Sequence, residues 1–166
     1  MVNTMEATEK QIAQGKKILD TVCAMLDGEE LKYGRDDEDM SVQLSFNNDD
    51  FEIVMVFKVF PERNLITLFS PLTFTAPEEE RQTIAMAMTV LNDVTYDGMW
   101  TINITNGHME FRMTNSYCDS IIGKACFKDM MDIAGSANNT FATKFFMLGK
   151  GALTFEQFLN DLFGEE

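Results

Sequence analysis

Three kinds of residue in this sequence could carry chemistry: one histidine, three cysteines and a large number of carboxylates. His108 could act as a general base or activate Cys23, Cys118 or Cys126 as a nucleophile. It lies beside an Asn-Gly pair between two alternating runs, however, and its neighbours of the same parity are polar. That pattern indicates an exposed residue next to a turn. One histidine cannot build a multi-histidine metal centre, and no CxxC pair is present.

Phosphate and calcium patterns are also missing. The stretch "GKGALT" lacks P-loop spacing, and the acidic segment "GRDDEDM" (34–40) has no central glycine and no terminal glutamate, so it predicts a solvated connector. A paired-carboxylate hydrolase needs a concave site that a sequence cannot show. A small carboxylate-using enzyme acting on a small molecule therefore stays open as an alternative, although we predict no enzyme, no catalytic residue, no metal and no cofactor.

Composition sets the class of protein. The chain has 166 residues, 45% of them hydrophobic, which suits one domain (1–166) with its own core. It has 13 basic against 27 acidic residues, a net charge of -14. Such a surface repels nucleic acid and attracts basic segments, or only keeps the protein in solution. Unpaired cysteines, no apolar signal region and no membrane-length apolar run predict a cytoplasmic protein with no membrane partner.

The first elements are a helix over about 3–27 and three strands at 41–46, 51–60 and 65–74. The helix carries apolar residues at helical spacing, and "NNDD" and "PERN" have turn composition. A pairing of Val42 with Met55 and of Val59 with Ile66 places apolar residues together on one face. The opposite face is more apolar than a solvated face should be, so another element or a partner covers it. Its central residues are Val54, Val56 and Phe69.

A second helix is predicted from Thr75, with Glu78 in capping-box position. One apolar stripe of this helix consists of Ile84, Ala87, Met88 and Leu91. A second stripe on the opposite side consists of Thr83, Met86 and Val90. A helix that is apolar on both sides is buried on both sides. Either both stripes belong to the internal core, or the second one meets another chain.

The stretch "TINITNGHMEF" (101–111) predicts a β-hairpin. Asn106-Gly107 fits a two-residue type I′ turn, which needs positive φ at both positions. Ile104 then faces Met109, and Trp100 faces Met113, while the other face is polar. The possible glycosylation sequon at Asn103 would lie in the middle of a strand, where it has no meaning.

The remaining residues predict helices. Ser116, with Asp119 in capping-box position, begins one that continues, whole or broken, to about Leu148. Thr154 and Gln157 cap a last short helix. The predicted fold is therefore α+β, with a five-stranded antiparallel sheet and the element order α-β-β-β-α-β-β-α, followed by the short helix.

This order and the phrase "SPLTFTAPEEERQTIAMAMTVLNDVTYDGMWTINITNGHMEFRM" resemble the YbjN family of bacterial sensory transduction regulators. The matching features are Pro77, Asn92, Gly98-Met99-Trp100 and Asn106-Gly107, within about residues 40–162. The resemblance implies a fold like that of type III secretion chaperones. Those chaperones are small, acidic and often dimeric proteins that hold extended stretches of a partner. The family offers no catalytic residue.

The function predicted from these observations is a non-enzymatic protein-binding module, chaperone-like or regulatory, whose partner is a protein and includes a second copy of itself. A purely structural component that oligomerises through sheet edges is a further alternative, which Pro71 near the end of a strand disfavours. The expected partner or dimer interface consists of Thr83, Met86, Val90, Val54, Val56 and Phe69.

Overall fold

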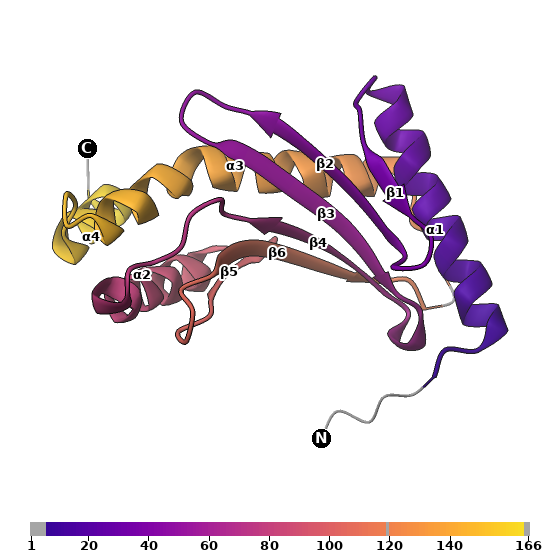
Figure 1. The fold of residues 1–166 in the computed structure, drawn as a ribbon, viewed down its shortest axis with the longest axis horizontal. Helices are drawn as coiled ribbons and strands as arrows, with labels where there is room; N and C mark the ends of the chain where they lie inside the picture. The colour runs from indigo at the N-terminus through magenta and orange to yellow at the C-terminus, as the bar shows by residue number, and fades with distance from the viewer. Residues whose placement is uncertain (1–5, 119, 165–166) are drawn as a thin grey trace. The chain divides into compact units, whose positions relative to one another are not determined.

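The computed structural model describes residues 6–118 and 120–164 (Figure 1). Its strands form an antiparallel sheet of six strands in the order β1-β2-β3-β4-β6-β5. The α+β class and the order of the predicted elements are confirmed, with one strand more than predicted. Along the chain the elements are α1 (Glu9–Gly28), β1 (Gly34–Asp36), β2 (Ser41–Asn47), β3 (Glu52–Phe60), β4 (Leu65–Pro71), α2 (Arg81–Val94), β5 (Met99–Ile102), β6 (Met109–Ser116), α3 (Lys124–Gly149) and α4 (Phe155–Phe163).

The chain divides into two compact units, each with its own core. Unit 1 comprises Met1–Ser45, Met55–Phe69 and Met113–Asp132, and unit 2 comprises Phe46–Val54, Ser70–Arg112 and Ile133–Glu166. Strands β2, β3, β4 and β6 and helix α3 each contribute residues to both units. The single domain expected from the chain length stays a prediction.

In unit 1, helix α1 begins later than predicted. Thr8 is its N-cap: the Thr8 hydroxyl accepts from the Gln11 backbone N–H, and the Gln11 side chain accepts from the Thr8 backbone N–H. Because of this capping box, the helix begins at Glu9. Residues 6–8 are therefore not helical, and residues 3–5 of the predicted helix lie outside the described part. The helix ends at Gly28, close to the predicted end.

The buried face of α1 packs on the strands of unit 1. Gly15 lies so close to them that a Cβ there would stand 2.7 Å from Met40 Cε and 3.0 Å from Val59 Cγ1. The first turns of α3 add Phe127, whose ring meets Phe57 edge-on at 6.1 Å between centroids. The fully buried side chains of this core include Leu19, Val22, Leu26, Met55, Phe57, Ile66, Leu68, Tyr117 and Phe127.

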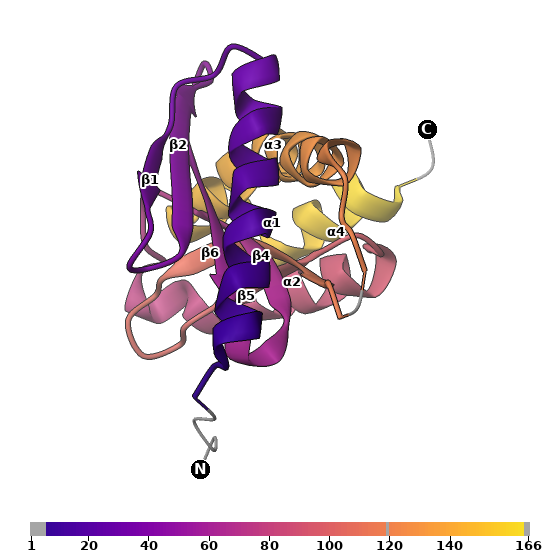
Figure 2. The same cartoon turned by 90° about the vertical axis from the view of Figure 1, so that its right-hand side faces the viewer.

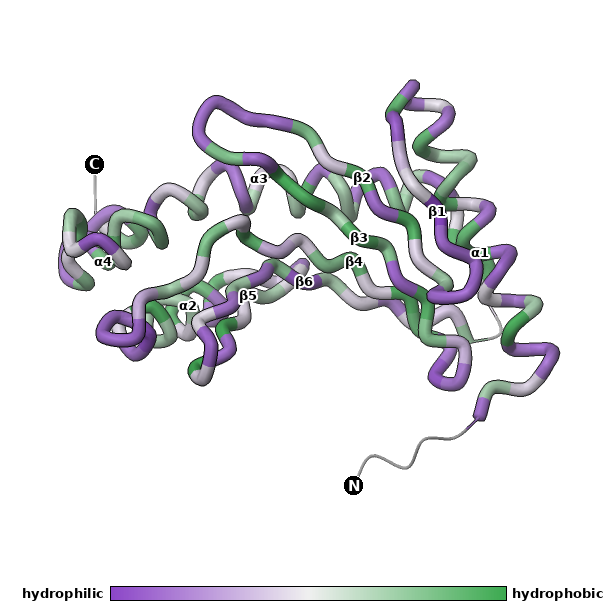
Figure 3. The backbone as a smooth tube through the Cα atoms, in the orientation of Figure 1, coloured by the Kyte–Doolittle hydropathy of each residue, from purple (hydrophilic) through white to green (hydrophobic). Residues whose placement is uncertain are grey.

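The acidic segment predicted as a connector contains β1, the strand that the sequence analysis missed. Gly34 pairs with Gln43 and Asp36 with Ser41, and all three β1 residues are exposed. Figure 3 shows β1 in the hydrophilic colour and β3 mostly in the hydrophobic colour. Because β1 has no apolar alternation, periodicity could not reveal it.

The strand registers are partly as predicted. Val59 pairs with Ile66 between β3 and β4, as expected. Before β2, however, the Val59 backbone N–H donates to the Met40 carbonyl at 3.0 Å, whereas the predicted register would place Met40 opposite Phe57. The shift is by two residues, so every side chain keeps its predicted face.

In unit 2, helix α2 begins at Arg81 rather than at Thr75. A single 3-10 turn, Glu78–Glu80, precedes it. Residues before that turn are held by other bonds: the Ala76 N–H donates to the Gly107 carbonyl at 2.9 Å, and Arg81 Nε donates to the Ala76 carbonyl at 3.2 Å. The predicted buried stripe is confirmed and packs on β5 and α4; its members are Ile84, Ala87, Met88 and Leu91.

The hairpin of β5 and β6 exists, but the predicted turn is wrong. Trp100 pairs with Phe111 and not with Met113. The Asn103 N–H donates to the His108 carbonyl at 2.8 Å, which closes a four-residue loop. Gly107 has φ of 77°, whereas Asn106 is not in the positive-φ region that a type I′ turn needs. The Asn103 side chain accepts from the Thr105 and Asn106 backbone N–H groups and stabilises this longer loop.

The predicted helix start at Ser116 is also wrong. Ser116 ends β6, and α3 begins at Lys124. Asp119 of the predicted capping box lies outside the described residues. Tyr117 is fully buried, and its backbone N–H donates to the Asn64 carbonyl at 2.9 Å, so the chain stays extended there. From Lys124 the helix continues without a break to Gly149, and the capping box of Thr154 with Gln157 on α4 is confirmed.

Candidate protein-binding surface

In unit 1, one face of β3 and β4 is apolar without being fully buried. Val56 lies directly opposite Phe69, and Phe60 lies opposite Leu65. The rings of Phe60 and Phe69 meet edge-on with centroids 6.4 Å apart. All four side chains are only half-buried, while Phe57 and others on the reverse face are fully buried. We call Val56, Phe60, Leu65 and Phe69 the β3–β4 outer face.

Two polar side chains interrupt this face. Lys58 Nζ stands 5.9 Å from the centre of the Phe60 ring and forms an ion pair with Asp39. That ion pair lowers the pKa of the Asp39 carboxyl. Thr67 bonds Thr114, with 3.0 Å between the two hydroxyl oxygens. Lys58 and Thr67 thus each have a polar partner of their own, Asp39 and Thr114, and the other residues of this face are apolar.

Val54, the third residue predicted on this side of the sheet, belongs to unit 2. It is half-buried, and its carbonyl accepts from the Ser70 hydroxyl at 2.8 Å. Ser70 in turn accepts from Asn138 Nδ2 at 3.0 Å, and both of these side chains are buried. Asn138 thus fixes α3 to the strands through a satisfied polar relay, which explains an asparagine in the middle of a helix.

Also in unit 2, the outward side of α2 carries the second predicted stripe. Met86 is 51% exposed, and Thr83 and Val90 are half-buried. Val94 lies one turn beyond Val90, is 44% exposed and continues the same stripe. The predicted stripe ended at Val90 and therefore did not include this residue. We call Thr83, Met86, Val90 and Val94 the α2 outer stripe.

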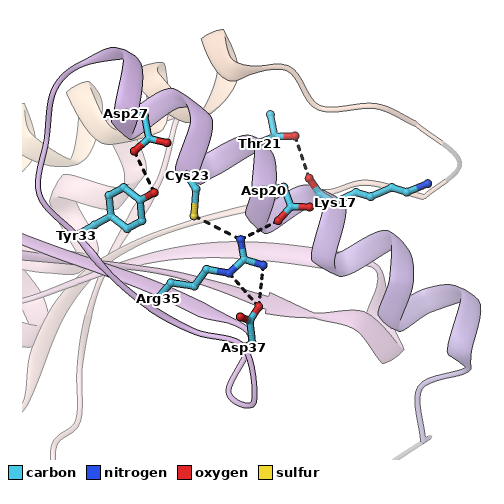
Figure 4. Close-up of polar contacts among 8 residues, drawn as sticks. All are labelled: Lys17, Asp20, Thr21, Cys23, Asp27, Tyr33, Arg35 and Asp37. Carbon is cyan, nitrogen blue, oxygen red and sulfur yellow. Dashed lines mark hydrogen bonds and ion pairs between the residues drawn. The ribbon is translucent and has the colours of Figure 1, made fainter.

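A polar cluster ties β1 to α1 in unit 1 (Figure 4). Arg35 Nη1 lies 2.7 Å from Asp20, and Arg35 Nη2 lies 2.7 Å from Asp37. Arg35 Nη1 also approaches Cys23 Sγ at 3.8 Å. The two carboxylates, Asp20 first, raise the pKa of Arg35. With its charge fully compensated, this arginine has a structural role and is not a receptor for an anion.

Tyr33 stands in the same cluster. Its hydroxyl donates to Asp27 at 3.1 Å. The contact with Cys23, with smaller effects from burial and Asp27, raises the pKa of Tyr33 to about 12. Figure 2 shows α1 beside β1 and β2, the arrangement that these contacts hold.

The residues that first suggested chemistry fall in different units. His108 Nε2 has Glu110 as its ion-pair partner at 3.6 Å, in unit 2. The three cysteines are free thiols and belong to unit 1. Over residues 6–118 and 120–164, no group of three His, Cys, Asp or Glu side chains is placed to hold a metal ion.

A groove of about 710 Å³ runs along β1 and β2, and its charged lining residues are Lys32, Arg35, Asp36 and Asp39. Its carboxylates are already engaged: Asp36 accepts from the Glu38 and Asp39 backbone N–H groups at 2.9 Å, and Asp39 pairs with Lys58. A general acid needs a raised pKa, whereas that of Asp39 is lowered. In the described part of the chain, no helix is both long and apolar enough to cross a membrane.

An antiparallel sheet of six strands with four helices in this order defines the class: it is the fold of type III secretion chaperones, as the family resemblance implied. A solved structure that it matches is titled the crystal structure of the ExsC–ExsE complex. The match has a TM-score of 0.54 at 12% identity and covers 74% of this chain and 88% of that one. At this identity the likeness shows the fold alone. No protein-family model matches the sequence, and no curated protein matches it.

Proposed function

We propose that this chain is a non-enzymatic protein-binding module, chaperone-like or regulatory, that acts on a protein partner. The β3–β4 outer face carries the proposal. In a sheet with one solvated face, that face should be polar, yet here Val56 and Phe69 are paired on it and Phe60 packs beside them. Contiguous apolar surface of this kind is typical of binding sites.

The chemistry of the surface also favours a kind of partner. Apolar side chains can fill the spaces between the half-buried aromatic rings, where they would bury area worth roughly 25 cal/mol per Å². The net charge of -14 attracts basic segments. A stretch with large apolar residues and basic flanks therefore fits best. The crystal structure with the same fold is itself, by its title, a complex of two proteins.

We further propose that two copies associate through the α2 outer stripe. A 51% exposed methionine followed by Val90 and Val94 at helical spacing is an adaptable apolar strip that another helix could cover. Membership of the YbjN family and a cytoplasmic location are part of the same proposal.

Two substitutions test the protein-binding surface. Val56→Glu and Phe69→Glu place a charge on the β3–β4 outer face, and burying that charge against a partner is costly. Tagged chains would be used to capture partners from the native cell, and the bound protein would be quantified. We expect each variant to lose at least about tenfold, a difference of about 1.4 kcal/mol. Ala13→Glu, on the exposed side of helix α1, adds the same charge to unit 1 outside the β3–β4 outer face and should capture as much as the original chain.

Unchanged capture by Val56→Glu and Phe69→Glu, with thermal melting showing both variants folded, would overturn the assignment of this face. Loss of capture in the Ala13→Glu control as well would show a general effect of charge and would equally contradict it.

Light scattering tests self-association. Met86→Glu should convert a dimer into monomer without unfolding the chain, because Met86 is 51% exposed. Ser136→Glu is the matched control, since Ser136 is exposed on α3 in the same unit and does not belong to the α2 outer stripe. A strictly monomeric original chain at high protein concentration would rule out the dimer.

The alternatives have less support. A carboxylate enzyme needs converging free acids, and Asp36 and Asp39 in the groove along β1 and β2 are engaged by backbone N–H groups and by Lys58. A structural component that grows through sheet edges needs long edges, and the edge strands β1 and β5 have three and four residues.

A further inference from the structure

A second concave site lies wholly in unit 2, between the loop that leads from β4 to α2 and the last turn of α3. It is a pocket of about 320 Å³. Ala76 and Met109, which are 2% and 0% exposed, form its apolar floor together with the buried Phe145. The pocket does not include the β3–β4 outer face or the α2 outer stripe.

An aromatic cluster forms one wall. The rings of Phe74 and Phe146 line the pocket and meet edge-on with centroids 5.3 Å apart. Phe51 braces both of them, at 5.0 Å from Phe74 and 5.6 Å from Phe146. Rings held against one another in this way form a preformed slot for a flat or slender apolar group.

The charge of the lining selects among apolar ligands. The chain has 27 acidic residues, and none of those in the described part of the chain lines this pocket, whose charged lining residue is Lys150. Lys144, the other lysine of unit 2, is paired with Asp161 at 2.8 Å. Lys150 has no carboxylate within 4.0 Å in the described part of the chain, and its ammonium stands 5.5 Å from the Phe146 ring centre. The exposed hydroxyl of Thr75 is a second polar group of the lining.

We propose that this pocket binds a small apolar monocarboxylate, with its hydrocarbon part against Phe74 and Phe146 and its carboxylate paired with Lys150. The volume is near the lower end of the roughly 300–1,000 Å³ range of small-molecule sites, so the ligand is compact. A dianion is disfavoured, because the lining offers one cation and the whole molecule is acidic. This site stands independently of the protein-binding proposal.

The test compares two probes of nearly equal shape, 4-phenylbutyrate and its uncharged analogue 4-phenyl-1-butanol. The full chain carries ¹³C-methyl methionine, and the Met109 signal, assigned with Met109→Leu, reports on the floor of the pocket. We expect the acid to shift this signal saturably and to bind more tightly than the alcohol. Lys150→Gln should weaken the acid by up to about fivefold, the effect of one exposed ion pair, and leave the alcohol unchanged.

Lys16→Gln on the exposed side of α1 removes the same charge from unit 1 and should leave both probes unaffected. The proposal is overturned if Met109 shows no saturable shift, or if Lys150→Gln and Lys16→Gln weaken the acid equally. It is also overturned if acid and alcohol bind equally well to the original chain. Equal binding would mean that the pocket recognises apolar surface alone, as it would if it bound an apolar side chain of a partner protein.

Discussion

At the residue scale, Tyr117 shows how a side chain can be well packed while its hydroxyl group lacks a hydrogen bond. Its ring is fully buried in the core of unit 1, and its hydroxyl has no hydrogen-bond partner in the described part of the chain. The backbone around it is well held, because Gln14 Nε2 donates to the Tyr117 carbonyl at 3.1 Å. A buried hydroxyl without a partner costs about 1–3 kcal/mol, so the ring must contribute more by packing than the hydroxyl costs.

The first prediction concerns Tyr117→Phe and alkaline pH. Burial, with smaller effects from Glu62 and Cys118, raises the pKa of Tyr117 from 10.0 to about 12 in the folded state. Above pH 10 the unfolded chain loses this proton while the folded chain keeps it, so stability falls as pH rises from 10 to 12. Tyr117→Phe should remove that part of the loss and should not lower stability at neutral pH. Denaturant unfolding at several pH values measures both effects.

Tyr96→Phe is the control, because the Tyr96 ring is 94% exposed in the folded state. A Tyr117→Phe chain that loses stability at neutral pH, or one that weakens between pH 10 and 12 as much as the original, would contradict this account of the buried hydroxyl.

The β5–β6 hairpin shows at the element scale which features the sequence could predict. Alternation correctly predicted the hairpin and placed Trp100 and Phe111 on the buried side. The turn was wrong by two residues, because the Asn-Gly signal was weighed without the side chain of Asn103, which caps the longer loop. The capping box at Thr8 was missed although its Thr-x-x-Gln pattern is the same as that of the box predicted at Thr154 and Gln157.

Gly107 carries the prediction for this element. Its φ is 77°, and a Cβ there would stand 2.3 Å from the Ala76 carbonyl oxygen. Gly151 also has positive φ, 66°, but nothing lies within 4 Å of the Cβ it would carry. Gly151→Ala should therefore cost only the backbone strain, about 1–2 kcal/mol. Gly107→Ala should cost clearly more, because the atom in its way is backbone. Thermal or denaturant unfolding of the two variants gives the comparison, and equal costs would show that the contact with Ala76 has no energetic weight.

Other elements were beyond sequence reasoning for physical reasons. The β1 strand pairs through its backbone while Arg35 bonds two carboxylates, so its side chains carry no apolar period. The pocket beside Lys150 is built from a loop and the end of a helix about 70 residues apart along the chain. In contrast, the sequence did predict the two surfaces around Val56 and Met86, because the apolar residues of each repeat with one period, that of a strand or that of a helix. The structure leaves those side chains half-buried or exposed, and their role stays a prediction.

At the scale of the whole molecule, a net charge of -14 acts in opposite ways on the two proposed partners, a second copy of the chain and a basic segment. Two copies of this chain repel each other over the screening length, which is about 30 Å at 0.01 M salt and about 10 Å at 0.1 M. A basic segment is attracted over the same distance. The two associations should therefore respond to salt in opposite directions.

The last prediction follows from this opposition. If two copies associate through the α2 outer stripe, added salt screens their repulsion while the apolar contact is kept, so the dimer should become tighter between about 0.01 M and about 0.1 M salt. Light scattering over a protein dilution series at each salt concentration measures this. Met86→Glu should stay monomeric at both concentrations, because the buried charge opposes the contact itself. A dimer that weakens with salt would instead be held by ion pairs between the two copies. Such a result would exclude the α2 outer stripe as the contact between copies.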